Sequence, residues 1–143
     1  MKFSLFIDNE REEEVIIYAR EKNALTERIE SIVNESERDV FGYRNEEIVK
    51  LELTAIACVF VEADKVYTIA DGERYQLRER LYQMEALLGN SCVRINQSCI
   101  VRVSEIERFD TSLSGALKVN LKNGFKDYVS RRQMKRVKER LGL

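Results

Sequence analysis

The sequence predicts an α+β fold that is mostly β, in which short antiparallel strands carry flanking helices. Two turns, Asp71-Gly72 and Asn123-Gly124, lie between alternating apolar and polar residues, which is the pattern of a β-hairpin. Residues 92–103 alternate in the same way and are rich in Val and Ile. The chain has no proline, which suits a series of short paired strands.

Residues 1–45 are expected to form a strand-strand-helix extension. Alternation predicts strands at 2–7 and 15–19, and Asn23 is suited to cap the helix that follows. The apolar face of this helix comprises Leu25, Ile29, Ile32 and Val33. The helix is expected to end near Ser36.

A polar connection at 37–46, containing one short strand, separates this extension from a domain at 46–143. Two strands and one helix cannot bury a sizeable core by themselves. The extension must therefore dock on the rest of the chain or on a second copy. We predict a homodimer that assembles through this region.

The first half of the domain is predicted to be a series of strands followed by one helix. Strands are expected at 48–51, 57–61, 65–70 and 74–77. The stretch at 57–61 is apolar throughout, which indicates a buried strand. The apolar face of the helix comprises Leu77, Leu81, Met84, Leu87 and Leu88, and Gly89 is expected to end it.

The second half begins with the strand stretch at 92–103, which the polar residues 96–98 interrupt. Asn96 and Gln97 offer the paired donor and acceptor that match adenine, and arginines match guanine or phosphate. The alternative is an ordinary hairpin with a polar turn. Ile106 and Phe109 are expected to extend the strand. The remaining predicted elements are a loop at 110–115 and strands at 116–121 and 125–129.

The last helix is expected to begin at Ser130, which can form a capping box with Gln133. Its buried face comprises Met134, Val137 and Leu141. Arg131 and Arg132 occupy its first two positions, where the helix dipole disfavours cations by ~0.3–1 kcal/mol each. Together with the free amide groups of the helix start, this placement indicates a site for phosphate or a guanine edge. The alternative is that both arginines pair with Asp127 or Glu105.

Composition argues against several classes of function. The chain has no histidine and no P-loop, dinucleotide-binding or nucleophile-elbow motif. Cys58, Cys92 and Cys99 lack metal-ligand spacing and are expected to be buried, reduced thiols. We therefore predict no enzymatic activity, no cofactor and no metal. No apolar run reaches the ~20 residues of a membrane span and residues 1–8 lack the pattern of a signal peptide, so we expect a cytoplasmic protein.

Charge is distributed unevenly along a chain whose net charge is −1. Residues 1–62 hold 8 Lys/Arg against 15 Asp/Glu, a net of −7, and residues 63–90 hold 4 against 5, a net of −1. Residues 91–143 hold 12 against 5, a net of +7. A basic third of this kind predicts a polyanionic partner for that part of the chain.

These residues resemble the LytTR family of bacterial DNA-binding domains over about residues 46–143. The stretch 93–101 is similar to the most recognisable motif of the family, and the hairpin at 122–124 and the helix start at 128–132 resemble its last elements. The overall layout resembles stand-alone regulators of the family. In those, the gene often neighbours one for a small membrane protein, so the resemblance implies a functional link to such a protein.

The resemblance implies a mostly β fold whose loops enter successive major grooves of double-stranded DNA. Gln97 and Arg132 match base-reading positions of the family. Either Asp64 or Lys65 fits a third base-reading position, and we select Lys65. The family often has His where Asn96 stands and Asn where Arg102 stands, and Arg102 is therefore expected to contact phosphate rather than to cap a turn. The predicted phosphate contacts are Arg94, Arg102, Arg131, Lys135 and Arg136.

We therefore predict a cytoplasmic, sequence-specific DNA-binding regulator of transcription. The alternative from another class is a protein-interaction module in which the acidic N-terminal segment is the working surface. RNA binding is a third option, which exposed aromatic residues among the basic ones would favour, but Phe125 and Tyr128 resemble strand residues instead.

Overall fold

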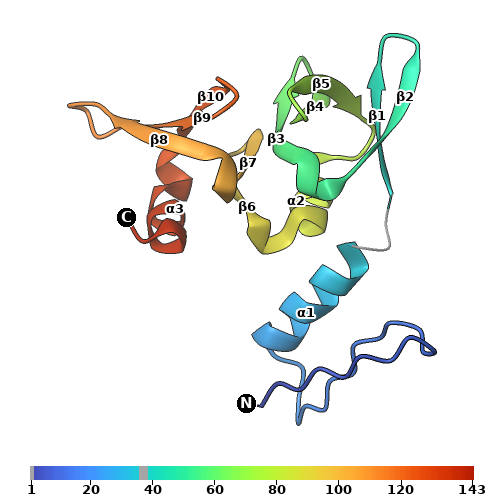
Figure 1. The fold of residues 1–143 in the computed structure, drawn as a ribbon. Coiled ribbons are helices and arrows are strands. Elements are labelled where there is room, and N and C mark those ends of the chain that lie inside the picture. The colour runs from blue at the N-terminus through green and yellow to red at the C-terminus, as the bar shows by residue number, and fades with distance from the viewer. Residues whose placement is uncertain (1, 36–38) are drawn as a thin grey trace.

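The computed structural model describes residues 2–35 and 39–143, which form two antiparallel sheets and three α-helices (Figure 1). The larger sheet has the strand order β2-β1-β5-β4-β3-β7-β6, and the smaller has the order β10-β9-β8. The strands are β1 (Val40–Arg44), β2 (Glu47–Leu51), β3 (Ile56–Glu62), β4 (Lys65–Ala70), β5 (Glu73–Leu77), β6 (Cys92–Asn96), β7 (Cys99–Arg102), β8 (Ile106–Thr111), β9 (Leu117–Leu121) and β10 (Lys126–Val129). The helices are α1 (Ala24–Glu35), α2 (Leu81–Leu88) and α3 (Arg131–Leu141), with 3-10 turns η1 (Leu53–Ala55), η2 (Gly89–Ser91) and η3 (Val103–Glu105).

Tight hairpins join neighbouring strands where the sequence places its turn residues. In the β4–β5 turn, Asp71 and Gly72 have φ of 51° and 78°, the left-handed pair that a type I′ turn requires. Gly124 in the β9–β10 turn also has a positive φ, of 91°. Both predicted hairpins are thus confirmed.

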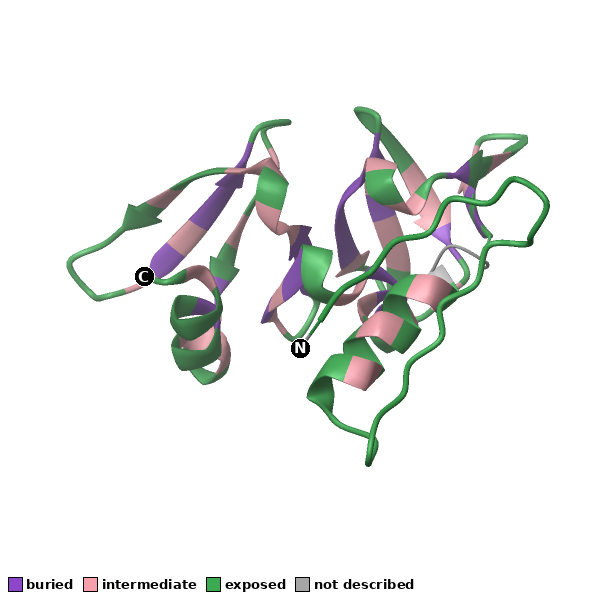
Figure 2. Cartoon of the chain, turned by 60° about the horizontal axis from the view of Figure 1, so that its bottom comes forward, coloured by how far each residue is buried: buried purple, intermediate pink, exposed green. Residues whose placement is uncertain are grey.

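Two hydrophobic cores lie on opposite faces of the seven-stranded sheet, where Figure 2 shows the buried central strands. On β3, Val59 faces the core that α2 covers, whereas its neighbours Cys58 and Phe60 face the core that β9 and α3 cover. On β7, Ile100 and Val101 divide in the same way. Burial on both faces is why residues 56–61 of β3 are all apolar.

The α3 helix closes the second core. Val137 is fully buried, and Met134 and Leu141 are half-buried on the same face, as the helical spacing predicts. Ser130 caps the start of the helix by accepting a hydrogen bond from the Gln133 amide at 3.3 Å. The helix therefore presents its first turn from a fixed position on the domain.

The N-terminal residues differ from the prediction. Residues 2–7 and 15–19 are extended but form no strand, because within the described residues no backbone hydrogen bond joins them to each other or to a sheet. The helix prediction is correct: the Thr26 amide donates to Asn23 Oδ1 at 3.0 Å, which makes Asn23 the cap of α1. The predicted end near Ser36 lies outside the described residues.

Three further boundaries differ from the expectation. Leu77 ends β5 rather than starting α2, whose first residue is Leu81. Ile106 and Phe109 do not extend β7, because η3 redirects the chain and they belong to β8 in the smaller sheet. The short strand expected within 37–46 is β1, and it pairs with β2 and β5 although it precedes residue 46. None of the helices in the described ranges combines the length and apolarity needed to cross a membrane.

Candidate nucleic-acid interface

Three connections of the chain meet at one edge of the molecule: the β3–β4 turn, the β6–β7 turn and the junction between β10 and α3. At the end of β3, the Val61 amide donates to the Ser98 carbonyl in the β6–β7 turn at 2.9 Å. On the other side, the Ser130 amide at the start of α3 donates to the Ile95 carbonyl of β6 at 2.9 Å. The β6–β7 turn is therefore attached by backbone hydrogen bonds to both neighbours.

Asn96 strengthens the second of these attachments. Its Nδ2 donates to the Tyr128 carbonyl at 2.8 Å and to Asp127 Oδ2 at 3.1 Å, both on β10. Its Oδ1 accepts from the Ser98 amide at 2.8 Å and from Ser98 Oγ at 3.2 Å. One side chain thus fixes the shape of the β6–β7 turn and its distance from the start of α3.

Gln97 occupies the tip of the β6–β7 turn with its side chain exposed. Beneath it, Arg94 donates from Nη2 to the Gln97 carbonyl at 2.6 Å and from Nε to the Asn96 carbonyl at 3.1 Å. The Nη1 of Arg94 pairs with Glu85 of α2 at 2.9 Å. Arg94 therefore supports the backbone of the turn, while the amide of Gln97 projects from it.

Arg131 and Arg132 form the exposed first turn of α3. Within the described ranges, neither guanidinium makes a hydrogen bond or an ion pair. The alternative pairing with Asp127 is not observed, because that carboxylate accepts from Asn96 and from the Tyr128 amide at 2.8 Å. Both cations remain open to a ligand, and the repulsion from the helix dipole is not relieved inside the protein.

Arg132, Lys135 and Arg136 lie at spacings i, i+3 and i+4 and so share one face of α3, which is exposed. The buried Val137 lies on the other side of the helix. The only acidic residue of α3, Glu139, is one turn further along. The cationic surface is therefore densest toward the N-terminal half of the helix, beside the β6–β7 turn.

Lys65 begins β4 directly after the β3–β4 turn and is exposed. The two turn residues, Ala63 and Asp64, have φ of 50° and 62°. This conformation is unfavourable for alanine, and it keeps the hairpin short and directs its tip outward. Lys65 thus lies at the same edge as Gln97 and Arg132, carried by the third connection.

The family assignment follows from comparison with known proteins. Residues 46–142 match the sequence profile of the LytTr DNA-binding domain, which is more than half of the chain. The chain belongs to the LytTR family. It is 32% identical to proteins of Staphylococcus aureus strains NCTC 8325 and COL, each named as an uncharacterized HTH-type transcriptional regulator, and each alignment covers 100% of this chain and 99% of the relative.

The fold is similar to a solved LytTr DNA-binding domain from Bacillus cereus. The TM-score is 0.68 at 19% identity, over 74% of this chain and 99% of that one. In the described part of our chain, strands separate each α-helix from the next, so a helix-turn-helix pair is absent there. Its exposed edge is instead made of two turns and one helix start.

Arg102 lies away from this edge, at the far end of β7 from Gln97. Its Nε donates to the Ile56 carbonyl at 2.5 Å and its Nη2 to the Leu53 carbonyl at 2.6 Å. Contrary to the expectation for this LytTR sequence, Arg102 does cap a turn, η1. The N–H groups of Nη1 and the second N–H of Nη2 are left for the predicted phosphate contact.

Two features of the LytTR edge were missed from the sequence. The role of Asn96 in joining β6 to β10 depends on a contact 32 residues distant, for which the local pattern contains no signal. Arg74 stacks on Tyr67, with its guanidinium carbon 4.2 Å from the ring centroid, and pairs with Glu62 at 2.9 Å. The backbone of Arg74 lies opposite Ile69, and its side chain extends along Tyr67 to bring a further guanidinium to Glu62, at the end of β3. The local sequence pattern contains no signal for this contact.

Thiol chemistry at this edge is suppressed. Burial raises the pKa of Cys99 far above its ordinary value, and the nearby carboxylate of Asp127 raises it further. Burial likewise raises the pKa of Cys58 to about 12. Both thiols stay protonated at neutral pH, so neither is activated as a nucleophile. No cluster of metal-binding side chains occurs among residues 2–35 and 39–143.

Proposed function

We propose that this LytTR protein regulates transcription by binding double-stranded DNA sequence-specifically through the edge formed by its two turns and the start of α3. The observation that carries the proposal is that hydrogen bonds hold three exposed polar tips in one rigid unit, next to cations without partners in the protein. Rigid presentation of a few donors and acceptors is what base reading in the major groove requires.

In this proposal, Gln97, Arg132 and Lys65 read base edges. The Gln97 amide can donate to and accept from one adenine, and the Arg132 guanidinium can donate two hydrogen bonds to one guanine. Lys65 adds a donor from the third connection. Arg131, Lys135 and Arg136 contact phosphates, assisted by the free amide groups at the start of α3.

Arg94 and Arg102 contribute mainly through the protein scaffold. All three kinds of guanidinium nitrogen in Arg94 already bind Glu85 or the carbonyls of the β6–β7 turn. Arg102 is engaged with η1. A phosphate contact by either residue remains a prediction, and it would use whatever hydrogen-bonding capacity these internal contacts leave.

We further propose that the protein works in the cytoplasm as a homodimer on two half-sites, about one or two helical turns apart. The regulators of S. aureus that it resembles match it from end to end, which supports the same role in transcription. The functional link to a small membrane protein stays a prediction from the resemblance.

Enrichment of bound sequences from random duplex DNA tests the proposal. We expect a defined motif that contains at least one adenine and one guanine position. Titrations at several salt concentrations should show log K falling by about 0.9 per phosphate contact with each tenfold rise in salt. The three cations that we assign to phosphates, Arg131, Lys135 and Arg136, predict a slope of about −2.7 per copy. Absence of any enriched motif, with the protein folded, would contradict sequence-specific binding.

A further inference from the structure

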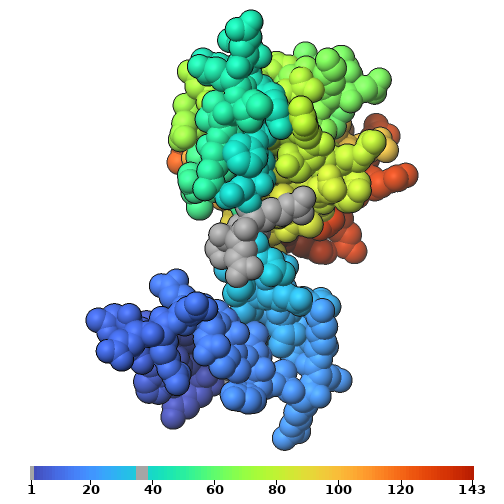
Figure 3. Space-filling model, turned by 90° about the vertical axis from the view of Figure 1, so that its right-hand side faces the viewer, coloured from blue at the N-terminus to red at the C-terminus, as the bar shows by residue number. Residues whose placement is uncertain are grey.

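The N-terminal residues expose an apolar surface that the chain does not cover. In the described range 2–34, no residue is buried. Phe3, Phe6, Ile7, Ile16 and Tyr18 are between 61% and 95% exposed. Figure 3 shows the N-terminal segment, in blue, projecting away from the rest of the molecule. So many exposed large apolar side chains in one short segment are rare on a monomer and indicate an interaction site.

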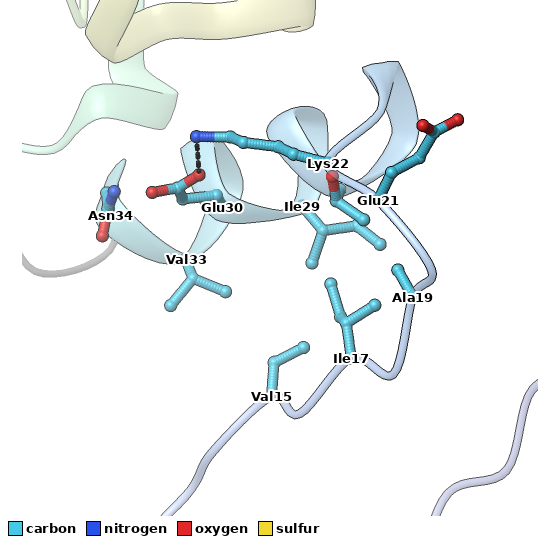
Figure 4. Close-up of a pocket in the computed structure, with 10 residues that line it drawn as sticks. Val15, Ile17, Ala19, Glu21, Lys22, Ile29, Glu30, Val33 and Asn34 are labelled. Carbon is cyan, nitrogen blue, oxygen red and sulfur yellow. Dashed lines mark ion pairs between the residues drawn. The ribbon is translucent and has the colours of Figure 1, made fainter.

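One side of the second extended stretch is partly covered by α1. Val15, Ile17 and Ala19 point from alternate positions toward the helix (Figure 4). On α1 they face Ile29 and Val33, and the groove between them has a volume of about 530 Å³. The stretch therefore lies on α1 as a strand would lie under a helix, although it has no strand beside it.

The other side of this stretch faces outward. Because side chains alternate along an extended chain, Ile16 and Tyr18 point away from α1. Within the described residues, no backbone hydrogen bond joins the stretch 15–19 to the stretch 2–7 or to any other segment. Apolar extended segments with unpaired backbone groups are templates for pairing with another chain.

We propose that a second copy of this chain occupies this surface, and that residues 2–19 of the two copies pair as an intermolecular β-sheet. Six large apolar side chains between residues 3 and 18 do not face α1, and each offers on the order of 100 Å². Their total, roughly 600 Å² per copy or about 1,200 Å² for two copies, reaches the lower end of the area that a stable dimer interface buries. The proposal rests on the homodimer proposed above and is independent of which residues read DNA.

The distribution of charge indicates that the partner is a second copy of the chain and that the two segments run antiparallel. The segment doubles back on itself, so the turn near residues 8–14 lies far from both of its ends (Figure 1). In the turn, Arg11 pairs with Asp8 and leaves Glu10, Glu12, Glu13 and Glu14 as the net acidic charge, whereas Lys2 and Arg20 lie toward the two ends. An antiparallel arrangement of two copies brings the acids of each beside the cations of the other. A parallel arrangement would oppose acid to acid.

Charge-reversal variants of the full chain test this arrangement. One variant combines Glu12→Lys with Glu13→Lys, and the other combines Lys2→Glu with Arg20→Glu. In sedimentation at low salt, the unmodified protein should have twice the chain mass of 16.8 kDa. Each variant alone should dissociate at least tenfold more readily, and an equal mixture should restore the dimer. A mixture that stays monomeric, or an unmodified protein that is monomeric at every concentration, would overturn the proposal.

A second pair of variants tests the apolar contact. Tyr18→Asp should give a monomer, while Leu113→Asp, which alters an equally exposed apolar residue in the β8–β9 loop, should leave the dimer intact. Amides of residues 3–7 and 15–19 should be protected from hydrogen exchange in the dimer and unprotected in Tyr18→Asp. A dimeric Tyr18→Asp variant would place the interface elsewhere. Binding of Tyr18→Asp to a single half-site should be unchanged, so loss of that binding would bear on the proposed function instead.

Discussion

Replacing Asn96 with alanine should loosen the fixed spacing between the β6–β7 turn and the start of α3, both of which we propose read DNA. The change removes four hydrogen bonds of 2.8–3.2 Å, two within the β6–β7 turn and two to β10. At about 0.5–1.5 kcal/mol for each typical bond, and less for a half-exposed side chain, the free energy of unfolding should fall by about 1–3 kcal/mol. The domain should therefore stay folded at room temperature.

The effect on DNA should be larger on the best site than on a scrambled one. Because Gln97 and the start of α3 lose their fixed separation, they can no longer both align with their bases. Specificity, measured as the ratio of the two affinities, should fall by about 1–2 kcal/mol, or roughly 5- to 30-fold. Fluorescence titrations well below the unfolding temperature measure this ratio directly.

Asn123→Ala provides a matched control. Asn123 Oδ1 accepts one hydrogen bond, from the Phe125 amide at 2.9 Å, in the β9–β10 turn. That turn does not join the reading tips, so the control should lose some stability and keep its specificity. The reasoning about Asn96 is refuted if Asn96→Ala weakens best and scrambled sites by the same factor, because the side chain then stabilises the fold without positioning the tips.

Other perturbations probe single cations and the buried thiols. Arg132→Ala should lose ~1–3 kcal/mol of binding free energy on the best site and flatten the preference at one base pair, whereas Arg131→Ala should weaken binding to all sequences equally and reduce the salt slope by about one unit. If Arg132→Ala weakens the best and the scrambled site by the same factor, Arg132 is a phosphate contact. Arg102→Ala should lower the free energy of unfolding by about 2–4 kcal/mol in urea titrations and leave the salt slope unchanged, since its donors serve η1. Burial raises the pKa of Cys58 from the ordinary 9.0 to about 12. The free energy of unfolding should therefore fall as pH rises above 9, because the thiol of the unfolded chain loses its proton first. Urea titrations at pH 8 and pH 10 should show a smaller difference in Cys58→Ala than in the unmodified protein, and an equal difference would contradict this prediction.

Much of the domain could be predicted from short stretches of sequence. The turn at Asp71-Gly72 forms because both residues tolerate positive φ, whatever surrounds them. The cap at Asn23 and the cap at Ser130 likewise depend on groups three residues away. Alternation and continuous apolar character located β3, β4 and most other strands, since burial of a face is encoded in the strand itself.

Other features were decided only by contacts between distant residues. Alternation in residues 2–7 predicted a strand, but a strand also needs a partner within hydrogen-bonding distance, and within the described residues no backbone hydrogen bond joins this stretch to another. Ile106 continues the pattern of β7, yet η3 sends it into another sheet.

The sequence determined that the C-terminal third is basic and that arginines begin the last helix. Tertiary structure decided which cations are free: Arg102 reaches the carbonyl of Leu53, 49 residues away, and Arg94 reaches Glu85, whereas Arg132 has no partner in the described residues. The physical reason is that the charge of a side chain follows from its residue type. Whether that charge finds a partner inside the protein depends on which carbonyls and carboxylates the fold brings within ~3 Å. That difference separates the residues that support the fold from the cations that we propose contact DNA.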